Sequence, residues 1–176
     1  MNDLRTLRPG DEFISKGTIR YIVLENNIGT IFNNAVLLKK TCMNGDSTYI
    51  FGRNGEYKNS AVREILSRES VVDDFKKDVE EFGEIIPSQV DLMTLDGIYP
   101  GEAIYDMVRL MSLREYQKYR PLIDKTNPRN SWWLSTMHSH VKGSTLYVQK
   151  DSGAVYDSSG QLNKKGIRPI ITVKFN

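Results

Sequence analysis

Alternating apolar and polar positions dominate the first third of the chain. The alternation runs through short segments rich in β-branched and aromatic residues, at 18–24, 29–32, 35–38 and 48–51. Polar pairs at Asn26-Asn27 and Asn33-Asn34 separate these segments and accept turn conformations. The pattern therefore predicts an antiparallel meander of strands that continues to residue 51.

The period changes to that of helices after residue 59. Val62, Ile65 and Leu66 share one face of a short helix that Asn59 or Ser60 caps. A second helix follows, with Gly83 placed to end it and an apolar face formed by Val72, Phe75, Val79 and Phe82. Two amphipathic helices are therefore expected after the meander.

A third helix is predicted at Ser112, where Glu115 follows with capping-box spacing. We expect it to stop near Arg120, because Pro121 disfavours helical geometry in the residue before it. Around this helix we predict a long loop over 84–99, with one short strand at 90–93, and further strands at 106–111, 146–148, 154–156 and 167–175. The predicted fold class is α+β, with antiparallel sheets and two to three short helices in a single domain over residues 1–176.

Composition supports a globular chain and limits its location. Hydrophobic residues make up 39% of the 176 residues, enough for a sizeable core. The first residues show no basic stretch followed by an apolar run, and no apolar run approaches the ~20 residues that span a bilayer. Cys42 is the lone cysteine and cannot form an internal disulfide. We expect a cytoplasmic protein without a membrane partner.

The net charge of +2 conceals a strong asymmetry along the chain. Residues 71–102 contain nine acids and two lysines, a balance of −7, whereas residues 103–176 contain twelve basic residues and five acids, a balance of +7. We expect the acids of the second helix to crowd its outward face; they are Asp73, Asp74, Asp78, Glu80 and Glu81. They either keep the helix solvated or imitate nucleic-acid phosphates toward a basic partner.

Four short patterns stand in a fixed order in the rest of the chain. They are Asn59-Ser60-Ala61-Val62-Arg63-Glu64-Ile65-Leu66-Ser67, Leu110-Met111-Ser112-Leu113-Arg114-Glu115, Ser131-Trp132-Trp133-Leu134-Ser135 and Gly166-Ile167-Arg168-Pro169. Together they resemble an uncharacterised family of bacterial and phage domains that is similar in layout to the C-type-lectin and formylglycine-generating-enzyme folds. The family usually follows its Trp pair with Leu-Arg-Ser-Pro, whereas Ser135, Thr136 and Met137 take the last three places here.

The related folds carry two activities that this chain does not support. Formylglycine-generating enzymes depend on a pair of reactive cysteines, which Cys42 alone cannot supply. Calcium-dependent lectins hold their cation with clustered oxygen ligands, and the only acids after Trp133 are Asp151 and Asp157. Phosphate-binding glycine loops, zinc motifs and the serine-hydrolase elbow are also missing. No metal or cofactor is therefore predicted.

The candidate site residues each allow a structural and a functional interpretation. Neighbouring strand residues point to opposite faces, so Trp132 and Trp133 are either both core or one of them is a surface ring. Arg168 lies between Gly166, which permits an unusual backbone angle, and a proline, so its guanidinium forms a rigid fork for Glu115 or for a loop carbonyl.

The pair His138 and His140 faces one side if it lies in a strand, and it then resembles a general acid and base. The other interpretation is that both imidazoles line a pocket or lie exposed in a loop. Lys142 or Arg168 would hold a phosphate beside them in the catalytic version.

Two functions are predicted from these features. The first is a non-catalytic binding module with a protein or nucleoprotein partner, in concrete form a phage- or plasmid-encoded inhibitor of a host defence nuclease of the anti-CRISPR kind. The alternative is an RNA-binding or metal-independent RNA-cleaving protein that uses His138 and His140. The sequence does not predict an oligomeric state.

Overall fold

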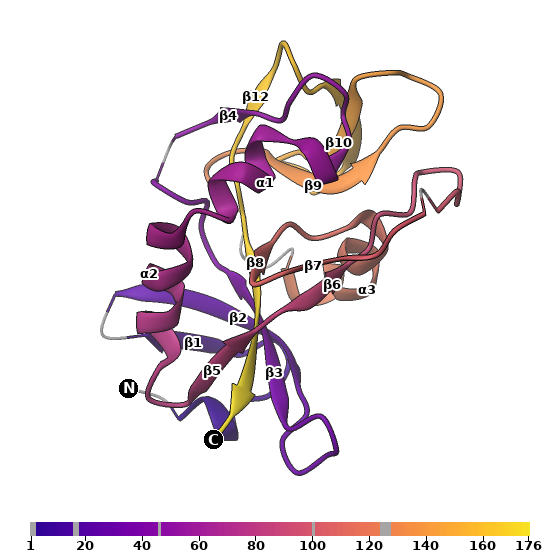
Figure 1. Ribbon diagram of the computed structural model, residues 1–176. Coiled ribbons are helices and arrows are strands. Elements are labelled where there is room, and N and C mark those ends of the chain that lie inside the picture. The colour runs from indigo at the N-terminus through magenta and orange to yellow at the C-terminus, as the bar shows by residue number, and fades with distance from the viewer. Residues whose placement is uncertain (1–2, 16–17, 46, 100, 124–127) are drawn as a thin grey trace.

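The computed structural model describes residues 3–15, 18–45, 47–99, 101–123 and 128–176 (Figure 1). Its largest sheet has six strands, and β13 (Ile170–Phe175) lies in the middle of it. The order is β1 (Glu12–Ser15), β2 (Ile19–Asn26), β3 (Asn34–Lys39), β13 and β5 (Gly83–Ile86), and β8 (Val108–Arg109) pairs with β13 as well. All of these pairings are antiparallel.

The described part of the chain also forms three smaller antiparallel sheets. They are β11 (Val155–Ser159), β10 (Ser144–Val148) and β9 (Trp132–Met137); β12 (Lys164–Lys165) and β4 (Tyr49–Ile50); β6 (Ser88–Val90) and β7 (Ile104–Asp106). The helices are η1 (Leu4–Thr6), η2 (Tyr57–Asn59), α1 (Ala61–Leu66), α2 (Glu69–Val79) and α3 (Leu113–Ile123). The predicted α+β class, with antiparallel sheets and few short helices, is confirmed.

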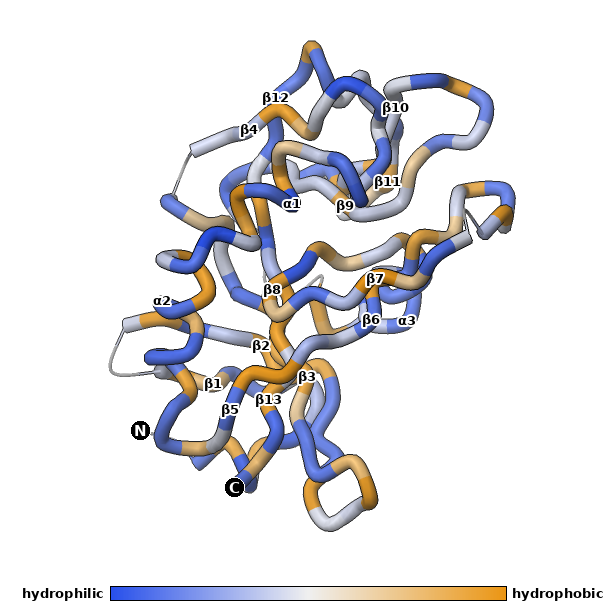
Figure 2. Tube along the Cα trace, viewed as in Figure 1, coloured by the Kyte–Doolittle hydropathy of each residue, from blue (hydrophilic) through white to orange (hydrophobic). Residues whose placement is uncertain are grey.

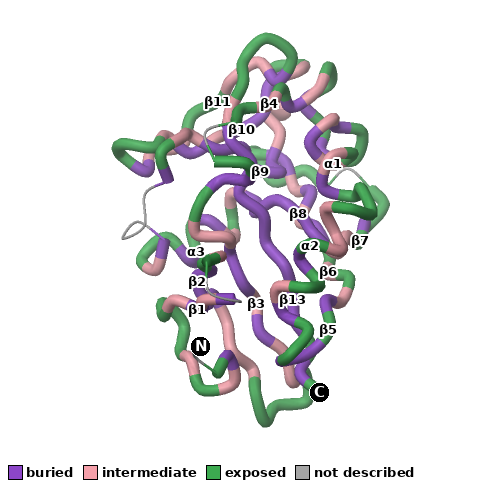
Figure 3. The backbone as a smooth tube through the Cα atoms, turned by 90° about the vertical axis from the view of Figure 1, so that its left-hand side faces the viewer, coloured by how far each residue is buried: buried purple, intermediate pink, exposed green. Residues whose placement is uncertain are grey.

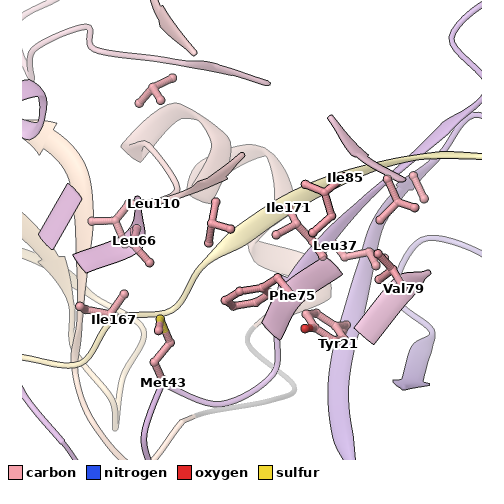
Figure 4. Close-up of a cluster of buried hydrophobic side chains, with 14 of the residues drawn as sticks. Tyr21, Leu37, Met43, Leu66, Phe75, Val79, Ile85, Leu110, Ile167 and Ile171 are labelled. Atoms are coloured by element: carbon pink, nitrogen blue, oxygen red, sulfur yellow. The ribbon is translucent and has the colours of Figure 1, made fainter. Parts of the chain in front are cut away.

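The six-stranded sheet is covered on both faces. Apolar residues gather in the middle of the molecule, where β13, β5 and β8 meet (Figure 2). Phe75 of α2 packs with Tyr21, Leu37 and Ile171 on one face (Figure 4), and a second cluster forms on the other face around α3. Strand β13 is accordingly buried along most of its length (Figure 3). A strand buried on both faces reads as a continuous apolar run, which the tail of this sequence shows.

The Trp pair connects the two core clusters. Trp132 packs in the α3 cluster and Trp133 in the α2 cluster, because adjacent strand residues point to opposite faces. Strand β9 is joined to the segment before β13 through a hydrogen bond that the Trp133 amide donates to the Gly166 carbonyl, 3.1 Å away. The two indoles and the C-terminal strand therefore belong to one packed body.

Three predicted strands differ from the structure. Residues 29–32 do not form a strand but the loop that joins β2 to β3, and Ile31 is 94% exposed at its tip. The strand predicted at 90–93 lies earlier, as β5 and β6, and residues 91–99 and 101–103 belong to a loop. The strand predicted at 106–111 is divided between β7 and β8.

Two predicted helix ends are also wrong. Helix α2 ends at Val79, and Gly83 instead begins β5, where a Cβ would lie 1.9 Å from the Lys174 carbonyl oxygen. Helix α3 continues past Pro121 to Ile123, which is buried in the α3 cluster. Packing of the last turn of α3 therefore outweighs the tendency of the residue before a proline to leave the helical conformation.

Within the described residues, no helix has the length and apolar character needed to cross a lipid bilayer.

Candidate functional site

Two loops meet on one side of the molecule and form what we call the loop face. They are residues 91–103, apart from residue 100, which lies outside the described residues, and residues 138–143 between β9 and β10. The Leu95 amide donates a hydrogen bond to the Met137 carbonyl at 3.2 Å, and Nε2 of His140 lies 3.5 Å from Oδ2 of Asp96. The loops are therefore held to each other.

The first of these loops has a fixed internal structure. The Thr94 hydroxyl lies 2.5 Å from Oδ1 of Asp96 and accepts a hydrogen bond from the Ile98 amide. Hydrogen bonds from Thr94 and Ser139 and the neighbouring His140 lower the pKa of the Asp96 carboxyl. The loop nevertheless presents apolar side chains to solvent, with Leu95 47%, Ile98 59% and Tyr99 41% exposed.

A groove of about 560 Å³ lies on one side of this loop. Its apolar lining includes Tyr57, Leu92 and Met137, together with Ile98 from the loop. Its charged lining consists of Glu56, Lys58 and Glu102, and Nζ of Lys58 lies 2.6 Å from Oε2 of Glu102. This ion pair lowers the pKa of the exposed Glu102 carboxyl.

A second cavity, of about 440 Å³, lies on the other side, between α3 and the sheet of β10 and β11. Helix α3 contributes Leu113, Tyr116, Gln117 and Arg120. The other lining residues are Leu95, His138, Leu146, Val155, Tyr156 and Asp157. The loop face thus forms a ridge between an acidic groove and a cavity of mixed polarity.

The two histidines lie on this ridge, in a loop and not in a strand. Their ring centroids are 6.4 Å apart with planes at 69°. Nδ1 of His138 accepts a hydrogen bond from the His140 amide at 3.2 Å, which leaves its Nε2 as the ring nitrogen that carries the proton in the neutral form. Lys142 follows in the same loop and is exposed.

Neither indole is part of this surface. Trp132 and Trp133 are both buried, so the interpretation that one ring is exposed for binding is wrong. The reason is that β9 is covered on both faces. The ring nitrogen of Trp133 donates to the Tyr49 carbonyl at 2.8 Å, and the Trp132 ring packs edge-on against Tyr116.

Arg168 is also buried, and its role is structural. Its Nε donates to the Lys39 carbonyl at 2.9 Å, and its guanidinium lies 5.4 Å from the centre of the Trp132 ring. Burial lowers its pKa to about 10. A backbone carbonyl is a partner of Arg168, as predicted, but it belongs to the last residue of strand β3 and not to a loop. The predicted partner Glu115 is wrong, because Glu115 binds Arg109 at 2.7 Å. Arg168 is not placed to hold an external phosphate.

The acids of α2 do not form one surface with the acids of the loop face. Figure 1 shows α2 and the 91–103 loop on opposite sides of the molecule. Asp73 and Asp74 lie 3.0 and 3.7 Å from Lys76 and Lys77, and Glu80 and Glu81 are exposed.

Asp78 departs from the outward orientation predicted for it. It faces the sheet, where its carboxylate accepts hydrogen bonds from Ser15 at 3.0 Å and from Tyr21 at 2.5 Å. Burial and this carboxylate raise the pKa of the Tyr21 hydroxyl. Asp78 therefore belongs to the packing of α2 against the sheet.

The described residues contain no group of three His, Cys, Asp or Glu side chains that would hold a metal ion. Comparison of the chain with family models, with curated proteins and with solved structures finds no match. The candidate site therefore rests on geometry alone.

Sequence reasoning identified the histidines but missed most of the site. No helix or strand period links Leu95, Ile98 and Tyr99. Apolar residues of a loop cannot be recognised as a binding surface from the sequence, because the sequence does not show that they are exposed. Tyr156 and Gln117 carry no motif and are brought together only by the fold.

Proposed function

We propose that this chain is a non-catalytic binding module of C-type-lectin-like layout, and that the loop face is its binding surface. The carrying observation is the set of exposed apolar side chains Leu95, Ile98 and Tyr99 on a hydrogen-bonded loop beside the 560 Å³ groove. Apolar residues that gather on a surface mark interaction sites. A loop already fixed in its own hydrogen bonds loses little conformational entropy on binding. The layout is supported by antiparallel sheets with irregular loops along one side.

The partner is a protein that presents a basic and apolar segment. Glu56 and Glu102 face the groove, where Lys58 is the one cation among the described lining residues. Asp96 lies on the adjoining ridge. Opposite charges across an interface raise the association rate and select the partner, while buried apolar contacts supply most of the affinity.

The test is affinity capture with matched surface variants. Ile98→Ser removes an exposed side chain from the loop face, and Leu162→Ser removes one that is 80% exposed on the turn after β11. We expect a partner that the wild type and Leu162→Ser capture equally and that Ile98→Ser loses. Equal capture by all three proteins would show that the loop face is not the binding surface.

A phage- or plasmid-encoded inhibitor of a host defence nuclease in the cytoplasm is the narrower form of this proposal. Exposed carboxylates of Asp74, Glu80, Glu81 and Glu84 on one side of the molecule support it, although Asp74 has Lys77 beside it. The test is cleavage of DNA by purified RNA-guided nucleases with wild type and with charge reversal at Glu80 and Glu81. Unchanged cleavage in the presence of the wild-type protein would refute the proposal that the chain inhibits such a nuclease.

A second candidate, RNA binding or metal-independent RNA cleavage, is favoured by the closeness of His138 and His140, whose rings lie 6.4 Å apart in one loop. One imidazole would take the proton of a ribose 2′-hydroxyl as its oxygen bonds to phosphorus. The other would protonate the departing 5′-oxygen, so that a cyclic phosphate and a 5′-hydroxyl form.

Labelled RNA incubated in EDTA tests this candidate. We expect degradation that both His138→Ala and His140→Ala abolish and that Leu162→Ser leaves unchanged. Intact RNA with the wild type, or degradation that survives both histidine substitutions, would refute catalysis by this pair.

A further inference from the structure

A cavity of about 340 Å³, which we call the α2 cavity, lies beside α2 on the side of the molecule away from the loop face (Figure 1). Helix α2 contributes Asp74, Phe75 and Asp78 to its lining. Lys39 from the end of β3 and Arg68 from the turn before α2 bring two cations to the same space. This volume accommodates one small organic molecule.

The end of β3 holds Lys39 in a fixed position. Its amide donates a hydrogen bond to the Pro169 carbonyl at 2.9 Å, and its carbonyl accepts one from Nε of Arg168 at 2.9 Å. Lys39 is also the cross-strand partner of Tyr21, so the two side chains lie on the same face of the sheet. The backbone therefore directs the Lys39 amine into the α2 cavity.

Two aromatic rings flank the Lys39 amine. Nζ lies 5.6 Å from the ring centre of Tyr21 and 5.6 Å from that of Phe75. The rings are 6.3 Å apart, with planes at 62° (Figure 4). Because cation–π attraction fades at about 6 Å, the rings act chiefly as apolar walls that keep water from the amine.

Among the described residues, no side chain forms an ion pair or a hydrogen bond with the Lys39 amine. The neighbouring Lys40 differs, because its amine pairs with Glu12. Asp78 faces the cavity, but its carboxylate already accepts hydrogen bonds from two hydroxyl groups. Burial lowers the pKa of the Lys39 amine, and attraction to Asp78 opposes this effect without cancelling it. A larger fraction of Lys39 is therefore present as the neutral amine, the form that acts as a nucleophile.

Arg68 can bind an anionic group in the same cavity. Its present partner is weak, since Nη2 lies 3.9 Å from Oε1 of Glu64 and both side chains are exposed. A ligand carboxylate or phosphate can replace that contact with a bidentate one. Asp74 has Lys77 3.7 Å away, which reduces its repulsion of such a group, and Tyr49 adds a hydroxyl to the lining.

We infer that Lys39 captures a small aldehyde that carries an anionic group, as an imine formed inside the α2 cavity with the anionic group on Arg68. A ligand held by charge alone would need the ammonium form of Lys39, which burial disfavours, whereas an aldehyde reacts with the neutral amine. The inference is independent of the loop face and of the histidine pair.

The reaction needs no oxidant or reductant. The lone pair of Nζ of Lys39 forms a bond to the carbonyl carbon, and the electron pair of the C=O bond moves to oxygen, which takes up a proton. Nitrogen then loses its protons as the hydroxyl group is protonated and leaves as water. One amine and one aldehyde thus give one imine and one water molecule.

Trapping with borohydride tests the inference. The full chain is incubated with 4-formylbenzoate, the imine is reduced to a stable amine, and peptide mass mapping gives the labelling rate of each lysine. We expect Lys39 to be labelled at least about tenfold faster than Lys40 at neutral pH, since each pH unit by which a pKa falls raises the neutral fraction about tenfold. The pH profile of labelling at Lys39 should have its midpoint below the ordinary lysine value of about 10.4.

Variants assign the two cations. Lys39→Arg keeps a cation beside the rings but cannot form an imine, so this fast label should disappear, and Lys40→Arg is the matched control that should keep it. For Arg68, the measured quantity is the ratio of the labelling rates with 4-formylbenzoate and with its uncharged methyl ester. Arg68→Gln should lower this ratio about 2- to 5-fold, the size of an exposed ion pair.

The inference is overturned if Lys39 of the wild type is labelled no faster than Lys40, a result that does not depend on the folding of any variant. It is also overturned if Lys39→Arg, shown by tryptophan fluorescence to be folded, keeps the fast label. An unchanged rate ratio in Arg68→Gln would refute the anionic group as part of the ligand.

Discussion

Gly166 joins β9 to the segment that leads into β13. A side chain at this position should lower the stability of the protein, because it would collide with Cys42. A Cβ at position 166 would lie 2.4 Å from Sγ of the buried Cys42. The backbone cannot move away easily. Its amide donates to the Ser131 carbonyl at 2.8 Å, and its carbonyl accepts from the Trp133 amide. Gly166→Ala should therefore strain the junction of the two sheets.

The magnitude follows from the packing. Adding a methylene-sized group to a full core costs about 1–3 kcal/mol, and the pinned backbone places Gly166→Ala near the upper end, about 3 kcal/mol. Cys42→Ala removes the sulfur and should cost about 1 kcal/mol alone. In the double variant the nearest atom is the Cβ of residue 42 at 3.1 Å, which requires only a small shift. The two substitutions should then couple favourably by about 2 kcal/mol.

Urea unfolding followed by tryptophan fluorescence measures this coupling, because both buried indoles lie beside the junction. Four proteins complete the cycle: wild type, the two single variants and the double variant. If the two free-energy changes add to within about 0.5 kcal/mol, the contact between residues 42 and 166 is not the reason for glycine at this position.

Two further predictions separate structural from surface residues. Asp78→Ala should lower the free energy of unfolding by about 1–3 kcal/mol, because it leaves the Ser15 and Tyr21 hydroxyls without their acceptor. Asp74→Ala on the same helix is the control and should change this free energy by less than about 0.5 kcal/mol. Urea unfolding of both variants measures the difference. Ile31→Ser at the tip of the β2–β3 loop should also stay within about 0.5 kcal/mol, and a larger loss would mean that the tip packs against the body of the protein.

Local signals in the sequence predicted the helix starts well. Ser60 caps α1 by accepting from the Arg63 amide at 3.0 Å. At α3 the Glu115 amide donates to the Ser112 hydroxyl, and the Ser112 amide donates to the Glu115 carboxylate. These contacts join residues three apart, so the spacing alone contains the information.

The errors arose where distant parts of the chain decide the structure. Gly166 was expected to permit an unusual backbone angle, but it is not among the glycines with positive φ, and the close approach of Cys42 accounts for it instead. Cys42 is far from Gly166 in sequence. Ile31 and Phe32 have the alternation of a strand, but they lie inside the β2–β3 loop, which the Asn27 amide closes by donating to the Asn34 carbonyl at 2.8 Å.

The candidate site was the least predictable part for the same reason. The cavity lining comes from the 91–103 loop, from α3 and from β10 and β11, and no sequence period links these elements. Its chemistry depends on which side chains remain exposed after folding. The Trp pair gave the strongest sequence signal and turned out to be core, which is the usual fate of large apolar residues.

The attachment of α3 to the sheet should be sensitive to acid, because it includes the carboxylate of Glu25. Lys118 lies 2.5 Å from this carboxylate, and the Tyr119 hydroxyl also donates to it. Burial opposes ionisation of Glu25, but the hydrogen bonds from Lys118 and Tyr119 outweigh it, so the folded state lowers its pKa. The ionised form therefore stabilises the protein above the unfolded pKa of about 4.3, and this contribution disappears as the pH falls through the lower, folded value.

Since Glu25 is partly exposed to solvent, the effect should be below about 1 kcal/mol. Unfolding measured between pH 7 and pH 3 should show a smaller loss of stability in Glu25→Gln than in the wild type. Identical pH profiles would mean that this carboxylate contributes nothing to holding α3, and with it the Gln117 and Arg120 wall of the cavity, in place.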